Sequence, residues 1–160
     1  MTIIGIDPGF NRCGFALVQK MNRNGKVIQT GLIETPTSLE SEKRLRFIAH
    51  RLKAVISKFQ PSEAAIERIF FFKNKKTALE IAEVVGMLKY ILAEKKIKIF
   101  FYTPLQLKQT LTGYGKANKK QIYYMLKQLL QGQKIPTQDD EADALAVALT
   151  HIFFKQISKF

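Results

Sequence analysis

The chain has 160 residues, 46% of them hydrophobic, and its 26 Lys and Arg residues against 13 Asp and Glu residues give a formal net charge of +13. This composition excludes a disordered chain and predicts a single globular domain over residues 1–160, and no apolar run reaches the roughly eighteen residues of a membrane span. The charge excess favours a polyanionic partner, most often a nucleic acid, over a basic proteome or a solvated lysine-rich face.

Two features of the chain bear on its compartment. Cys13 is the only cysteine, so no intrachain disulfide can form and a reducing compartment is expected. The N-terminus lacks the basic head and long apolar core of a signal peptide. We therefore expect a cytoplasmic protein with no membrane partner.

The first predicted strand, residues 2–7, is an apolar, β-branched run that ends on Asp7. Pro8 and Gly9 stop it, because proline lacks an amide donor and glycine permits turn dihedrals. Asp7 thus lies at the mouth of a buried strand, where an unpaired charge is costly to desolvate. It needs a partner, which is a basic group, a set of backbone amides or a metal ion.

Two further strands are predicted at 13–19 and 26–34, with an Asn-Gly hairpin signal between them at 24–25. The short turns make the first three strands an antiparallel meander. Apolar residues at three- and four-residue spacing then predict a helix over 39–59, with Ser38 as its candidate cap and Pro61 beyond its end.

The fourth predicted strand, 64–69, follows a helix and is apolar enough to be a buried parallel strand. Glu67 interrupts this run, just as Asp7 ends the first strand. A salt bridge to Arg68 or another cation explains Glu67 as well as a functional role does.

The next segment places Phe70, Phe71 and Phe72 directly before Lys73. Aromatic faces stack on unpaired bases and lysines contact phosphates, although one or more of these phenylalanines can belong to the core.

The helix predicted over 77–95 is apolar around more than one face. Its second apolar face needs a cover, which is either a homodimer interface or another helix of the same subunit.

A fifth strand is predicted at 98–102, and Pro104 can open a short helix that contains Lys108. Residues 111–120 form a glycine-hinged basic loop, which carries Lys116 and Lys119 and leads into a helix at about 119–130. This loop suits contact with a phosphate backbone, and its residue order does not match a P-loop.

The last predicted helix, 137–151, begins with three of the four aspartates of the chain, Asp139, Asp140 and Asp143. Asp143 shares a helix face with Asp140 and also with Asp139, so the spacing leaves the functional pair open. A capping box of Thr137 with Asp140 is the alternative, and it explains Asp143, one turn into the helix, less well.

Carboxylates that converge from two strand ends and a helix start repel one another unless a cation neutralises them. Hard oxygen ligands in that number suit Mg²⁺ or Mn²⁺. Two such ions about 3.5–4 Å apart form a clamp that serves phosphodiester hydrolysis. Together with the basic, aromatic-bearing surface, these acids predict a metal-dependent nuclease.

The order β-β-β-α-β-α-β-α, with acids at these places, resembles the ribonuclease H-like superfamily. Within that superfamily the chain resembles the RuvC family of Holliday-junction resolvases over nearly its whole length. The motifs that carry the resemblance are Gly-Ile-Asp-Pro-Gly at 5–9, Ala-Ile-Glu-Arg-Ile-Phe at 65–70, Lys-Asn at 73–74, Lys-Gln-Thr at 108–110, Gly-Tyr-Gly-Lys-Ala-Asn-Lys at 113–119 and Asp-Glu-Ala-Asp-Ala-Leu-Ala at 140–146. It implies an α/β fold, ribonuclease H-like, in which a five-stranded mixed sheet of three antiparallel and then two parallel strands is flanked by helices.

The resemblance also implies which residues do the chemistry. It selects Asp140 over Asp139 and implies two Mg²⁺ ions per active site, for which Mn²⁺ can substitute. It places one aromatic residue, Phe70, against the bases at the junction centre. The run of three phenylalanines leaves open which of them enters the junction. The implied catalytic and metal-binding residues are Asp7, Glu67, Asp140 and Asp143, and the DNA-binding residues are Phe70, Lys73, Lys108, Lys116 and Lys119.

The implied activity is resolution of four-way DNA junctions in recombination and repair. A homodimer would make paired, symmetric nicks in opposing strands and leave ligatable 5′-phosphate ends, with a branch-migration motor of the RuvAB type as its partner. The alternative is a non-catalytic nucleic-acid-binding module of the same fold, which would keep the charge without needing four acids. An actin-like ATPase or sugar kinase needs two related domains, for which 160 residues leave no room. His50 and His151 are expected to be structural.

Overall fold

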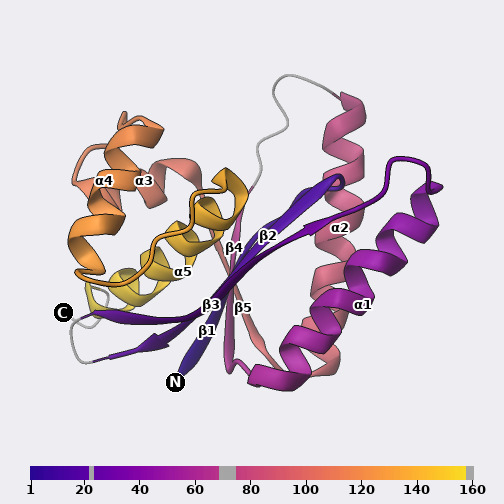
Figure 1. The fold of residues 1–160 in the computed structure, drawn as a ribbon, viewed down its shortest axis with the longest axis horizontal. Coiled ribbons are helices and arrows are strands. Elements are labelled where there is room, and N and C mark those ends of the chain that lie inside the picture. The colour runs from indigo at the N-terminus through magenta and orange to yellow at the C-terminus, as the bar shows by residue number, and fades with distance from the viewer. Residues whose placement is uncertain (22–23, 69–74, 158–160) are drawn as a thin grey trace.

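The computed structural model describes residues 1–21, 24–68 and 75–157, with the backbone alone described at 75, 76, 156 and 157. Five strands and five helices lie within these ranges (Figure 1). In chain order they are β1 (Thr2–Asp7), β2 (Arg12–Lys20), β3 (Gly25–Glu34), α1 (Ser41–Phe59), β4 (Glu63–Glu67), α2 (Lys75–Glu94), β5 (Lys98–Tyr102), α3 (Pro104–Thr112), α4 (Lys119–Leu129) and α5 (Asp139–Ile157).

The strands form one sheet in the order β3-β2-β1-β4-β5. β1 pairs with β2 and β2 with β3 in antiparallel fashion, while β1 with β4 and β4 with β5 are parallel. This confirms the mixed, ribonuclease H-like sheet of three antiparallel and two parallel strands. Because β4 follows the helix α1, it can join the sheet parallel to β1 on the side away from β2.

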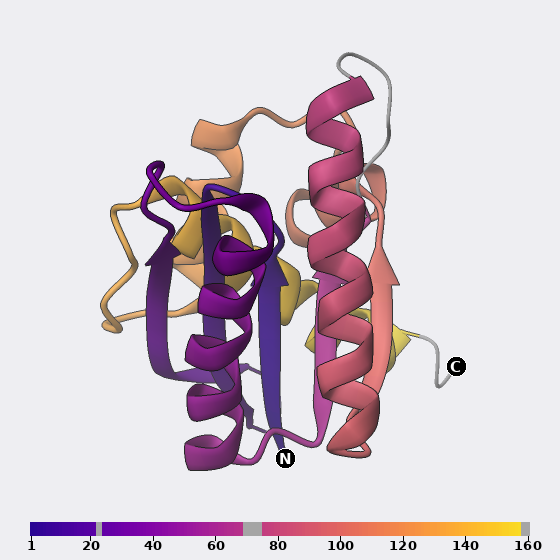
Figure 2. The same cartoon turned by 90° about the vertical axis from the view of Figure 1, so that its right-hand side faces the viewer.

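Helices cover both faces of the sheet, so it is the middle of three layers (Figures 1 and 2). α1 and α2 lie on one face, and α3, α4 and α5 lie on the other. Successive side chains of a strand point to opposite faces. Along β1, Ile4 and Ile6 therefore join the core under α1 and α2, and Ile3 joins the core under α5. Each fully buried side chain of this size contributes about 1.5–3 kcal/mol.

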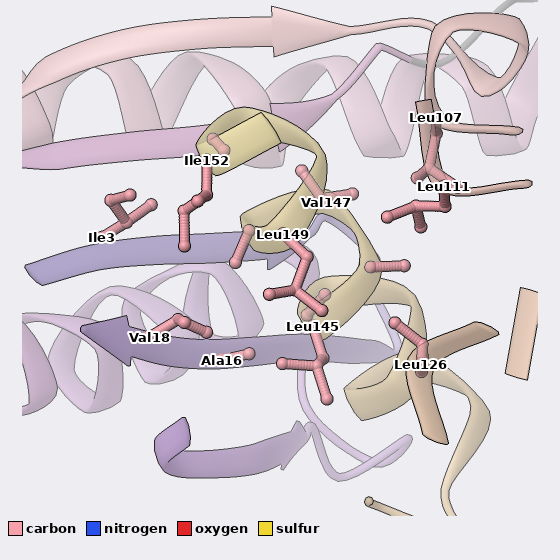
Figure 3. Close-up of a cluster of buried hydrophobic side chains, with 14 of the residues drawn as sticks. Ile3, Ala16, Val18, Leu107, Leu111, Leu126, Leu145, Val147, Leu149 and Ile152 are labelled. Atoms are coloured by element: carbon pink, nitrogen blue, oxygen red, sulfur yellow. The ribbon is translucent and has the colours of Figure 1, made fainter. Parts of the chain in front are cut away.

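The helix α5 packs directly on the strands because two glycines make room for it. A Cβ at Gly5 would lie 2.1 Å from the carbonyl oxygen of Ala144, and one at Gly14 would lie 2.0 Å from that of Asp140. Leu145, Val147 and Leu149 then belong to the buried cluster that α5 forms with the sheet and with α3 and α4 (Figure 3). The first turn of α5 is thereby held against β2, beside the end of β1.

Three expectations about element ends are wrong. α1 begins at Ser41, and its N-cap, Glu40, makes no side-chain capping hydrogen bond. Ser38 is not a cap, because the preceding residues form a turn in which the Leu39 amide donates to the Pro36 carbonyl. β4 was predicted over 64–69 but runs over Glu63–Glu67 and ends before Arg68, while residue 69 lies outside the described residues. α5 begins at Asp139, so Thr137 lies too early to make a capping box with Asp140.

No helix among residues 1–21, 24–68 and 75–157 combines the length and the apolar character that crossing a membrane requires.

Candidate active site

Asp7 and Glu67 end two adjacent parallel strands. Ile6 of β1 lies opposite Ile66 of β4, and each of these strands stops at the next residue, the acid. By the alternation of side chains, Asp7 shares the face of Ile3, and Glu67 that of Ala65. Both Ile3 and Ala65 belong to the core under α5. The two carboxyl groups are therefore neighbours on the face that α5 covers.

The start of α5 adds two more acids to this edge of the sheet. Asp140 lies against Gly14, which is the β2 partner of Asp7. Asp143 follows one helical turn later. The side chains of Asp140 and Asp143 are 25% and 29% exposed, whereas that of Asp139 is 81% exposed. Helix spacing alone left the pair open, and the packing of α5 on the sheet turns Asp140 and Asp143 inward.

The four carboxyl groups act on one another electrostatically. Burial, and then the charges of Glu67, Asp143 and Asp140, raise the pKa of Asp7 to about 7. Burial and then the charge of Asp143 raise the pKa of Glu67 as well. Like charges raise each other's pKa only at short range. The structure therefore brings Asp7, Glu67, Asp140 and Asp143 into one acidic cluster.

Two basic side chains pair with the two inward-facing aspartates of α5. Arg12 Nε donates to Asp140 Oδ2 at 2.9 Å, and Lys119 Nζ donates to Asp143 Oδ2 at 2.9 Å. The hydrogen bond to Asp143 raises the pKa of Lys119. Sequence reasoning named Lys119 and missed Arg12. The only sequence signal for Arg12 is its place at the start of the second strand, near the level of Asp7.

The other lysines named from the sequence lie at different distances from the acids. The charge of Lys108, on α3, lowers the pKa of Glu67 after that of Lys119, so both lysines lie within electrostatic reach of the cluster. Lys116 is exposed in the loop between α3 and α4. Phe70 and Lys73, together with Phe71 and Phe72, lie outside the described residues.

The ion pair of Glu67 with Arg68 is not formed among the described residues. The Arg68 guanidinium instead lies over the ring of Phe101, 5.8 Å from its centre. Asp7 and Glu67 take part in no ion pair with any residue that the structure describes. Two of the four acids are thus left without a basic partner there.

The cluster fits a divalent cation in its donor chemistry and charge. All four side chains offer hard carboxylate oxygens, the ligands that Mg²⁺ and Mn²⁺ prefer. Burial, and then repulsion from the neighbouring acids, raise the pKa values of Asp7 and Glu67, and a bound cation would offset both effects. Within the described ranges, no three acidic, histidine or cysteine side chains already form a metal cage. Asp140 binds Arg12 and Asp143 binds Lys119 through one carboxylate oxygen each, so these pairs have to open before both oxygens can bind a cation.

His151 has a structural role that its burial explains. The ring is fully buried, with Nε2 2.7 Å from Glu63 Oε2 and Nδ1 2.6 Å from the Tyr102 hydroxyl. Burial lowers the pKa of His151, and the neutral ring satisfies both contacts by donating to Glu63 and accepting from Tyr102. This network ties α5 to β4 and β5. His50 is exposed on α1.

Known proteins resemble this chain in sequence and in structure. Residues 3–151 match the family model described as Crossover junction endodeoxyribonuclease RuvC. The protein of that name from Halothermothrix orenii is 43% identical over 151 residues, which cover 94% of this chain and 92% of the relative. The one from Caldicellulosiruptor saccharolyticus is 46% identical over 153 residues, with 95% and 92% covered.

Among solved structures, that of Thermus thermophilus RuvC in complex with a Holliday junction substrate superimposes with a TM-score of 0.92. It is 29% identical in sequence, and the match covers 99% of this chain and 96% of that one. The likeness extends over the whole sheet and its helical layers.

Proposed function

This chain belongs to the RuvC family of crossover junction endodeoxyribonucleases, and from that premise we propose that it cuts four-way DNA junctions by metal-dependent phosphodiester hydrolysis. The observation that carries the proposal is the meeting of Asp7, Glu67, Asp140 and Asp143 at one edge of the sheet. A non-catalytic DNA-binding module has no need to hold four mutually repelling carboxyl groups together. The enzyme is therefore favoured over such a module.

The four acids are the proposed catalytic residues and metal ligands. Asp7 and Glu67 are available as ligands, and Asp140 and Asp143 become available when Arg12 and Lys119 release them. When bound, two Mg²⁺ ions, for which Mn²⁺ can substitute, would supply an activated water molecule and positive charge for the leaving oxygen. The sheet edge and the first turn of α5 hold the carboxyl groups in place before substrate arrives, which is what preorganised catalysis requires.

Basic residues beside the acids are proposed to hold the DNA backbone. Lys119 begins α4 and Lys108 lies on α3, so both can reach a phosphate placed at the cluster. Lys116, exposed between them, extends this basic surface. Phe70 and Lys73 complete the proposed set, with Phe70 as the aromatic that contacts bases at the junction centre.

A homodimer is proposed to form through the exposed face of α2. Leu79 and Tyr90 each expose 68% of their surface, and Ala82 and Gly86 lie exposed between them at helical spacing. A monomer rarely leaves such an apolar stripe open to solvent. Pairing of two stripes would give a two-fold dimer, whose symmetry suits paired nicks in the opposing strands of a junction.

Cellular context completes the proposal. We place the protein in the cytoplasm, acting in recombination and repair, with a RuvAB-type branch-migration complex as its partner. Its nicks would leave 5′-phosphate ends that a ligase can seal.

Cleavage of a synthetic four-way junction tests the proposed activity. We expect nicking that requires Mg²⁺ and spares linear duplex of the same sequence. Asp7→Asn and Glu67→Gln should bind the junction but leave it uncut. Asp139→Asn is the matched control, because Asp139 has the same chemistry but points to solvent, and it should cut normally. Cleavage by Asp7→Asn at the wild-type rate would refute the metal site.

Sedimentation tests the dimer. The wild type should be dimeric at micromolar concentration, and Leu79→Glu should shift it to monomer and uncouple the two nicks. A wild-type protein that stays monomeric under these conditions would contradict the proposed interface.

A further inference from the structure

Arg12 is held in one position at the margin of the acidic cluster. Each nitrogen of its guanidinium has an oxygen partner: Nε lies 2.9 Å from Asp140, Nη2 3.1 Å from the Gln138 side chain and Nη1 3.3 Å from Glu34. These partners come from the start of α5, the loop before it and the end of β3. A planar guanidinium that binds partners in three directions is held in one orientation.

The backbone that carries Arg12 is anchored independently of these contacts. The Thr35 amide donates to the Asn11 carbonyl at 2.9 Å, and the Thr35 hydroxyl donates to the Phe10 carbonyl at 2.9 Å. The Arg44 guanidinium covers the Phe10 ring, 4.5 Å from its centre. The turn between β1 and β2 is thereby fixed, and Arg12 extends from it toward Asp140.

The charges of the acidic cluster and its basic partners determine how much negative charge is left to attract a divalent cation. The four carboxyl groups are opposed by Arg12 and Lys119, which also pair with Glu34 and Asp139, so these ion pairs leave at least two negative charges when all the acids are ionised. That remainder attracts divalent cations. A cation that takes Asp140 as a ligand approaches a guanidinium already bonded to one oxygen of the same carboxylate. The two positive groups repel each other across it.

We propose that Arg12 competes with the divalent cation for Asp140, and so weakens metal binding by the protein in the absence of DNA. The inference rests on the proposed metal site. Arg12 acts through Asp140 and is a positioning residue. Its side chain is 42% exposed, so it has room to turn away when a cation takes Asp140, while Gln138 and Glu34 remain as acceptors.

Titration of the DNA-free protein with Mn²⁺ in a calorimeter tests the competition without depending on activity. Arg12→Gln should bind Mn²⁺ about tenfold more tightly than the wild type, since loss of one adjacent positive charge is worth roughly a factor of ten in affinity. Arg12→Lys keeps the charge and should stay within about threefold of the wild type. Arg51→Gln, on the exposed face of α1, removes an equal charge elsewhere and should change nothing.

Three outcomes would overturn the inference. Mn²⁺ affinity of Arg12→Gln equal to that of the wild type would show that Arg12 does not compete with the cation for Asp140. Weaker Mn²⁺ binding would mean that Arg12 orients Asp140 for the metal. Weaker junction binding with unchanged Mn²⁺ affinity would assign Arg12 to the DNA.

The same titration separates failure of this inference from failure of the proposed site. If the wild type binds Mn²⁺ and Asp7→Asn does not, the site stands whatever Arg12→Gln does. If no variant binds Mn²⁺, Arg12→Gln included, both the site and the competition are refuted. Far-ultraviolet circular dichroism of each variant confirms that it is folded.

Discussion

Replacement of Asp7 by asparagine should stabilise the metal-free fold and abolish cleavage. The pKa of Asp7 rises from 3.8 to about 7 on folding, first through burial and then through the charges of Glu67, Asp143 and Asp140. The unfolded chain thus gives up this proton at lower pH than the folded one does. Asp7 therefore destabilises the folded state progressively as pH rises from about 4 to 7, and fully above that range.

The size of this effect follows from the two pKa values. A tenfold change in an acid constant is worth about 1.4 kcal/mol, so the rise from 3.8 to about 7 corresponds to at most roughly 4 kcal/mol. Asp7 is half-buried and water still screens it, so we expect roughly 1–2 kcal/mol. For a domain of this size, that is a rise of about 2–8 °C in Tm.

Thermal unfolding in a chelator, at about pH 5 and about pH 8, measures the effect. Asp7→Asn should exceed the wild type in Tm at both, with the larger difference at the higher pH. Asp139→Asn removes an exposed acid from the same region and should show no such growth. A difference that is constant or shrinks as pH rises would refute the electrostatic account of the cluster.

Other predictions follow from the contacts around the site. Lys119→Met should slow junction cleavage by roughly 100-fold with a smaller effect on junction binding in a gel-shift assay; a rate within about threefold of the wild type would remove Lys119 from the chemistry. Tyr102→Phe leaves Nδ1 of buried His151 without its donor, and urea unfolding should show a loss of about 1–3 kcal/mol, whereas unchanged stability would mean that this bond contributes nothing. Gly14→Ala places a Cβ 2.0 Å from a backbone oxygen of α5 and should cost about 3 kcal/mol or more as well as activity. Gly86→Ala, whose Cβ meets nothing within 4 Å, should leave monomer stability within about 1 kcal/mol, and equal behaviour of the two glycine variants would contradict the packing described for α5.

Much of the fold could be predicted from local patterns. The strand at 98–102 was predicted with its observed bounds, because a short β-branched and aromatic run between a helix and a proline has few alternatives. Asp7 and Glu67 could be placed together because each interrupts or ends an apolar run, and runs of that kind become adjacent buried strands.

Element ends were harder to predict, because several residues compete for them. Ser38 has good capping chemistry, yet the turn that precedes α1 shifts the N-cap to Glu40. The start of α5 shifted in the same way, from Thr137 to Asp139. Propensity at a single residue is a weak signal against the geometry of the connecting turn.

The pairing of Arg12 with Asp140 could not be predicted, because it joins residues 128 positions apart. It depends on where α5 crosses the sheet, and that crossing depends on Gly5 and Gly14 lacking side chains. The same crossing decides that Asp140 points inward while Asp139 points to solvent. Helix periodicity gives the relative directions of these side chains but not which direction meets the sheet.

Location of bound Mn²⁺ by anomalous diffraction, in crystals of the protein with a four-way junction, would test the central claim most directly. The account predicts anomalous peaks between the carboxyl groups of Asp7, Glu67, Asp140 and Asp143, next to a phosphate of the DNA. Peaks elsewhere, with the four side chains turned apart and Asp140 and Asp143 still held by Arg12 and Lys119, would contradict it.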